Sequence, residues 1–76
     1  MQTAQATKEA EMRIDVKSLR EARGWTQREL ATRSGVAQGQ ISAWEAGRQP
    51  NAYSAYKLAK AFGVTMESLF TEEGQA

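Results

Sequence analysis

Four glycines divide the middle of this chain into short segments of similar length. They are Gly24, Gly35, Gly47 and Gly63. Each follows a stretch in which apolar residues recur every three or four positions, which is the spacing of an amphipathic helix. Glycine is common just after a helix because it accepts the left-handed backbone conformation that ends many helices. The pattern predicts short helices joined by tight turns. No segment shows sustained alternation of period two, so no strand is expected.

Residues that cap helix N-termini stand before four of these segments. They are Asp15, Thr26, Asn51 and Thr65. Thr26 is followed three residues later by Glu29, which is the pattern of a capping box. The segment 37–46 is expected to be a fifth helix by its spacing, although Ala37 offers no capping oxygen and Gly39 inside it lowers helix propensity. The expected fold class is therefore all-α, with five short helices in one compact domain.

The apolar positions of the five segments can close one core. The expected core residues are Val16, Leu19, Trp25, Leu30, Ala31, Val36, Ile41, Trp44, Ala55, Leu58, Ala59, Phe62 and Leu69. Tyr53 and Tyr56 lie off the apolar stripe of their helix, so we expect their rings to be exposed.

Composition excludes several classes of function. The chain has no cysteine and no histidine, so thiolate metal sites, disulfides and histidine general bases are ruled out. We expect no enzyme activity, no cofactor and no metal, and no pocket for a small-molecule ligand. No apolar run is long enough for a membrane span, and the first residues do not form a signal peptide. We expect a cytoplasmic protein, bacterial or phage-encoded and associated with the nucleoid.

The charge is unevenly distributed along the chain. Residues 17–60 carry eight basic and three acidic side chains, a net charge of +5, whereas residues 61–76 carry −3. A basic middle segment suits a polyanionic partner, although a solvated helical surface with uneven charge would look the same. We divide the chain into a polar, disordered arm (1–13), a domain (14–70) and an acidic tail (71–76).

The most specific stretch runs from Gln27 to Ala46, QRELATRSGVAQGQISAWEA. Two helices joined by a glycine-containing turn can pack at a steep angle when a small residue allows close contact. Ala31 is that small residue, and Gly35 lies in the turn. Several constrained positions within twenty residues, with capping residues on both sides, predict a helix-turn-helix.

The chain resembles the Cro/cI-like (xenobiotic-response-element type) helix-turn-helix family, with a lambda-repressor-like domain. The resemblance covers residues 14–70 and rests on LREARGWTQRELA, GVAQGQISAWEAGRQPN and LAKAFGVTMESLF. It implies a five-helix domain that binds double-stranded operator DNA as a two-fold dimer and usually represses transcription. It also implies that the helix at about 37–45 lies in the major groove.

The resemblance also assigns roles to individual residues. Those implied to face the bases are Ala37, Gln38, Gly39, Ser42 and Ala43. Those implied to face the DNA phosphates are Gln27, Arg28, Gln40, Arg48, Asn51 and Tyr53. Arg20 and Glu45 match a structural ion pair between two helices. The chain departs from the family at Ala37, where a serine or threonine cap is usual, and at Ser34, where a hydrophobic residue is common.

So few base-reading side chains make a homodimer on a palindromic operator the expected arrangement. Met66 and Phe70 are four residues apart, and so on one face of the last helix, and are the candidate dimer contacts. The leading hypothesis is a sequence-specific transcriptional repressor. The alternative is an antitoxin-like or adaptor protein that uses the same fold, and the same apolar corner, to bind another protein.

Overall fold

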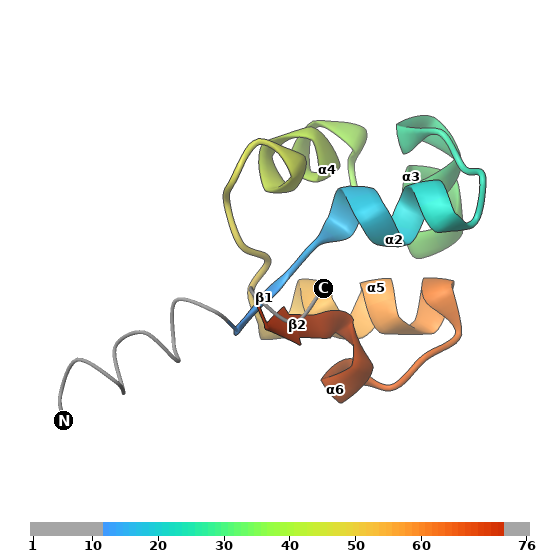
Figure 1. Ribbon diagram of the computed structural model, residues 1–76. Coiled ribbons are helices and arrows are strands. Elements are labelled where there is room, and N and C mark those ends of the chain that lie inside the picture. The colour runs from blue at the N-terminus through green and yellow to red at the C-terminus, as the bar shows by residue number, and fades with distance from the viewer. Residues whose placement is uncertain (1–11, 73–76) are drawn as a thin grey trace, which may run out of the picture.

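The computed structural model describes residues 12–72 and contains five helices and two short strands (Figure 1). In chain order these are β1 (Met12–Ile14), α2 (Val16–Ala22), α3 (Gln27–Ser34), α4 (Gln38–Glu45), α5 (Ala52–Phe62), α6 (Met66–Leu69) and β2 (Phe70–Glu72). The five predicted helices are confirmed. The expected disorder of the arm lies largely outside the described residues, as does most of the acidic tail.

Local capping explains where four of the helices begin. The Thr26 hydroxyl accepts a hydrogen bond from the Glu29 backbone N–H at 3.0 Å, and the Glu29 carboxylate accepts one from the Thr26 N–H at 2.8 Å. This reciprocal pair is the predicted capping box of α3. Asp15, Asn51 and Thr65 cap α2, α5 and α6. Each accepts one backbone N–H through a side-chain oxygen, without the reciprocal bond of the capping box. Ala37, as expected, makes no side-chain cap.

The turn between α3 and α4 depends on two neighbouring residues. Gly35 ends α3 with φ at 77°, a left-handed conformation that residues with a Cβ rarely adopt. The Ser34 hydroxyl donates to the Leu30 carbonyl at 2.7 Å and accepts from the Val36 N–H at 3.2 Å. Serine therefore fits this position because its hydroxyl satisfies backbone groups at the turn.

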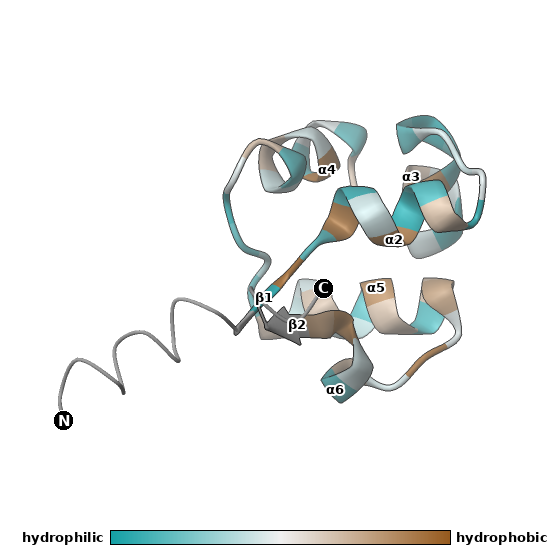
Figure 2. Cartoon of the chain, viewed as in Figure 1, coloured by the Kyte–Doolittle hydropathy of each residue, from teal (hydrophilic) through white to brown (hydrophobic). Residues whose placement is uncertain are grey.

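The core lies between the helices and matches most of the expected positions. The buried apolar residues are Ile14, Val16, Leu30, Val36, Ile41, Trp44, Ala55, Leu58, Ala59, Phe62 and Leu69. Leu19, Trp25 and Ala31 are only partly buried at its edge. Trp25 stacks on Phe62 with ring centres 5.8 Å apart. Figure 2 shows apolar and hydrophilic residues alternating along the helices, as expected when each helix buries one side.

The prediction that the chain has no strand is wrong. β1 and β2 pair antiparallel, with Met12 opposite Glu72 and Ile14 opposite Phe70. Strands of three residues are too short to show period-two alternation, and their pairing joins the two ends of the domain (Figure 1). The strand also corrects the position of Phe70, because α6 ends at Leu69 and Phe70 is in extended backbone.

The described helices are all short. Between residues 12 and 72, no helix has the length and apolar character needed to cross a bilayer. The same residues contain no group of three or more metal-ligating side chains.

Candidate nucleic-acid interface

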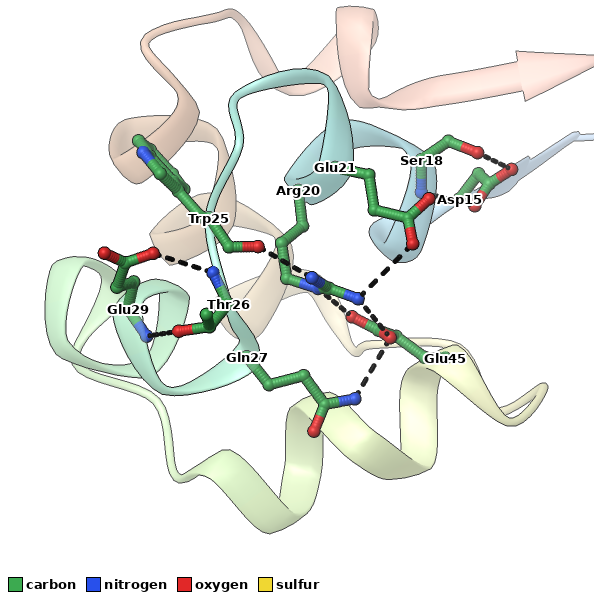
Figure 3. Close-up of polar contacts among 9 residues, drawn as sticks. All are labelled: Asp15, Ser18, Arg20, Glu21, Trp25, Thr26, Gln27, Glu29 and Glu45. Atoms are coloured by element: carbon green, nitrogen blue, oxygen red, sulfur yellow. Dashed lines mark hydrogen bonds and ion pairs between the residues drawn. The ribbon is translucent and has the colours of Figure 1, made fainter.

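A partly buried ion pair joins α2 to the C-terminal end of α4. The Arg20 guanidinium donates to both carboxylate oxygens of Glu45, from Nε at 2.7 Å and from Nη2 at 3.1 Å (Figure 3). Its third nitrogen, Nη1, donates to the Trp25 carbonyl at 2.7 Å. The two side chains are 12% and 7% exposed. Such a two-point contact fixes direction as well as distance, so it sets the orientation of α4 against α2.

Gln27 joins the same network from the first position of α3. Its amide nitrogen donates to Glu45 Oε1 at 3.0 Å, while its amide oxygen has no partner among the described residues (Figure 3). Glu45 therefore ties the N-terminal end of α3 to the C-terminal end of α4. The hydrogen bond from Arg20 lowers the pKa of the Glu45 carboxyl below its usual value, against the opposing effect of burial, and Gln27 adds to the lowering.

The outer face of α4 is polar, uncharged and open to solvent. Gln38, Gly39 and Ser42 are exposed and Ala43 is half-buried, whereas Ile41 and Trp44 on the opposite side are buried. Ala37 is exposed just before the helix. The structure thus brings the five residues implied to face bases onto or next to one accessible face. Glu45, the one charged residue of α4, is turned inward to Arg20.

The residues implied to face phosphates come from α3, α4, the connection after α4 and the start of α5. Arg28, Gln40 and Arg48 are exposed, and Tyr53 is 66% exposed. Asn51 uses its amide oxygen to cap α5, accepting from the Ser54 N–H at 2.8 Å. The Asn51 amide nitrogen, with two N–H donors, stays available to an external acceptor. Gln27 is the exception in this group, because one of its N–H donors is already bonded to Glu45.

A residue that sequence reasoning missed fixes the connection between α4 and α5. Gln49 accepts from the Ile14 N–H at 2.8 Å and donates to the Ile14 carbonyl at 3.4 Å. The preceding Arg48 N–H donates to the Ala43 carbonyl at 3.1 Å. The backbone that presents Arg48 is therefore held to α4 on one side and to β1 on the other. No local signal could have identified Gln49, because Ile14 lies 35 positions away in the sequence.

The two candidate dimer residues, Met66 in α6 and Phe70 at the start of β2, are both exposed. Met66 is 36% exposed and Phe70 is 40% exposed. They are not two positions of one helix face, since Phe70 begins β2. They nevertheless stand out as two of the four large hydrophobic side chains that are exposed in the described part of the chain, together with Tyr53 and Tyr56.

Comparison with known proteins agrees with this geometry. A family model described as helix-turn-helix matches residues 16–69, which spans α2 to α6. The chain belongs to the helix-turn-helix family. A curated relative from Sinorhizobium fredii (strain NBRC 101917 / NGR234), named uncharacterized HTH-type transcriptional regulator y4dJ, is 43% identical over 54 residues. The match covers 70% of this chain and 70% of the relative.

Family membership decides the broad class of activity. The chain is a DNA-binding transcription regulator of the helix-turn-helix type and not an enzyme. Its α3 and α4 are the two helices of the motif, and double-stranded DNA is its partner. The predicted class of function is confirmed at this level.

Proposed function

We propose that this protein is a sequence-specific regulator that inserts α4 into the major groove and holds the flanking phosphates with the start of α5 and the connection before it. The carrying observation is the exposed, uncharged face of α4, bordered by exposed cationic and amide donors. Gln38 at the first position of α4 is the principal base reader, since its amide can contact the N6 and N7 edge of adenine. Arg48, Asn51 and Tyr53 contact phosphates and so set the register.

Gly39 supports a close approach of DNA to α4. Glycine inside a helix costs about 1 kcal/mol relative to alanine. A Cβ built at Gly39 would meet no atom within 4 Å, so packing within the protein does not require a glycine there. A glycine that folding does not need, on an exposed helix face, is consistent with a surface that must come close to a partner. Gly39 and Ser42 would then let the backbone of α4 lie near the base edges.

The proposal includes a dimer on a palindromic operator and repression as the outcome. One α4 face carries two polar base-reading side chains, Gln38 and Ser42, and two half-sites double that number. Met66 and Phe70 form a small exposed apolar corner that can meet its copy across a two-fold axis. The free dimer is expected to be weak, with DNA promoting it by holding two subunits about one helical turn apart.

Two substitutions separate base reading from phosphate binding. The site is first obtained by selecting bound sequences from a random duplex pool. Gln38→Ala should then lose roughly 1–3 kcal/mol on the selected site while keeping its affinity for random duplex. Arg48→Ala should weaken binding to all sequences alike and make the slope of log affinity against log salt about one unit less steep. If Gln38→Ala keeps full preference for the selected site, Gln38 is not the principal reader.

Sedimentation tests the assembly. At saturation on a palindromic duplex, two protein chains should bind each duplex, and Phe70→Asp should abolish cooperative binding because it places a charge in the apolar corner. One chain per duplex would refute the dimer. Cooperative binding retained by Phe70→Asp would place the interface elsewhere.

A further inference from the structure

A basic hollow of about 400 Å³ lies between the C-terminal end of α3 and the outer side of α5. Its walls carry three cationic side chains, Arg33, Lys57 and Lys60, together with the rings of Tyr53 and Tyr56. Of these five residues, only Tyr53 belongs to the interface described above. The remaining four include all three cations, and base reading by α4 does not use their positive charge.

The three cations of the hollow have no acidic partner. None of the ion pairs among residues 12–72 involves Arg33, Lys57 or Lys60. α5 contains no acidic residue. Glu29, one helical turn before Arg33, is engaged in the capping box of α3. The charge of the hollow is therefore available to an external anion.

Aromatic rings hold these cations in place without neutralising them. The segment YSAYKLAK contains two Tyr–Lys pairs spaced four residues apart, which lie one turn apart on the same helix face. Lys57 Nζ is 4.6 Å from the centre of the Tyr53 ring, and Lys60 Nζ is 5.5 Å from that of Tyr56. Arg33 lies over Trp25 at 4.4 Å. Cations positioned in this way lose less conformational freedom when an anion binds.

We propose that this hollow binds backbone phosphates of the duplex that α4 reads, an inference that rests on the function proposed above. Tyr53 belongs both to the hollow and to the phosphate-binding start of α5. From Tyr53 to Lys60 the helix rises about 10 Å, so the cations continue the phosphate contacts along α5. Each lysine ammonium lies over one face of a tyrosine ring, so the positive charge stays beside the phosphate contact proposed for Tyr53.

The shape and exposure of the hollow fit a polyanion better than a small ligand. Small-molecule sites usually enclose most of their ligand between largely apolar walls. Here Tyr53 and Tyr56 are 66% and 48% exposed, and Arg33 and Lys60 are exposed as well. Cations gathered on one accessible surface, here Arg33 from α3 with Lys57 and Lys60 from α5, are the pattern expected where a nucleic-acid backbone binds.

The test compares salt dependence in matched variants. Each phosphate contact contributes about 0.9 to the slope of log affinity against log salt, so the double variant Lys57→Gln/Lys60→Gln should bind mixed-sequence duplex with a slope about 1.8 less steep. Lys60→Gln alone should give half of that change. Lys17→Gln is the matched control, since it removes one exposed charge from α2 and should leave the slope unchanged. Thermal melting of every variant checks that the fold is kept.

The outcomes separate this inference from the proposed function. Mixed-sequence duplex reports phosphate contacts without requiring base reading. A reduced slope in the double variant supports the hollow even if the random pool yields no preferred sequence, a result that would refute sequence-specific regulation. A parental slope in the double variant overturns the inference even if a preferred sequence is found. Loss of binding to a polyglutamate peptide, with the DNA slope intact, would also overturn it and assign the hollow to an acidic protein partner.

Discussion

Replacing Arg20 by methionine tests whether the Arg20–Glu45 pair holds the motif together. The change keeps most of the side-chain stem but removes the donors to Glu45 and to the Trp25 carbonyl. It leaves a carboxylate that is 7% exposed with Gln27 as its remaining hydrogen-bond partner among the described residues. Exposed ion pairs contribute about 0–1 kcal/mol, whereas breaking a buried one costs about 3–5 kcal/mol.

The two side chains are only 12% and 7% exposed but neither residue is fully buried, so the cost of breaking the pair should lie at the lower end of the range for buried pairs. We expect Arg20→Met to lower the free energy of unfolding by about 3 kcal/mol. For a domain of this size, that corresponds to a fall in Tm of about 12–24 °C. Urea denaturation at pH 7 measures the loss. Arg28→Met in α3 is the control, since it removes an exposed charge and should change stability by less than about 0.5 kcal/mol.

The pH dependence of stability gives a second measurement. Folding should shift the pKa of Glu45 down in the parent and up in Arg20→Met. In the parent, the pKa of Glu45 is lowered by Arg20, so its contribution is present above the unfolded pKa and is lost as pH falls through the folded pKa. In Arg20→Met, burial without the guanidinium should raise that pKa. The folded variant then binds a proton more tightly than the unfolded chain, and acid reduces its deficit relative to the parent.

Two results would refute this reasoning. A loss below about 1 kcal/mol in Arg20→Met would place the pair among exposed ion pairs. A stability difference between parent and variant that stays constant as pH falls from 7 through the carboxylate range would show that Glu45 does not respond to its partner.

Two further substitutions test local features of the fold. Ala37→Ser should stabilise the protein by about 0.5–1 kcal/mol, because α4 has no side-chain cap. The gain is measured as a higher urea midpoint. An unchanged midpoint would mean that the backbone N–H groups of the first turn gain nothing from the hydroxyl. Gln49→Ala should destabilise the protein by about 1–2 kcal/mol and speed amide exchange at Ile14, because it removes both side-chain bonds to that residue; unchanged exchange at Ile14 would contradict the bracing role.

Sequence reasoning succeeded where the determining contacts are local. The capping box of Thr26 and Glu29 spans three positions, and the N-caps of α2, α3, α5 and α6 each bond to a backbone N–H three residues ahead. These contacts are encoded in short patterns, so the helices and their starts could be predicted. The exposed face of α4 followed from the same periodicity, which places Ile41 and Trp44 inward and Gln38 outward.

The failures share a different origin. β1 and β2 join positions nearly sixty residues apart and are three residues long, so neither carries its own periodic signal. Phe70 was expected in the last helix, but it pairs with Ile14 as the first residue of β2. Gln27 bonds to Glu45 across 18 positions, and Gln49 bonds to Ile14 across 35. An amide side chain can serve many partners, and the residue type alone does not say which one the fold brings near.

The two ends of α4 are held to the rest of the protein very differently, and this bears on how the helix would read DNA. At its C-terminal end, Trp44 is buried and Glu45 is bonded to Arg20 and Gln27. At its N-terminal end, Ala37 provides no side-chain cap, and a Cβ at Gly39 would have no atom within 4 Å. Gln38, the proposed principal reader, therefore sits at the end with fewer restraints. A phosphate oxygen placed there would accept hydrogen bonds from the first N–H groups of α4, which have no side-chain cap in the free protein.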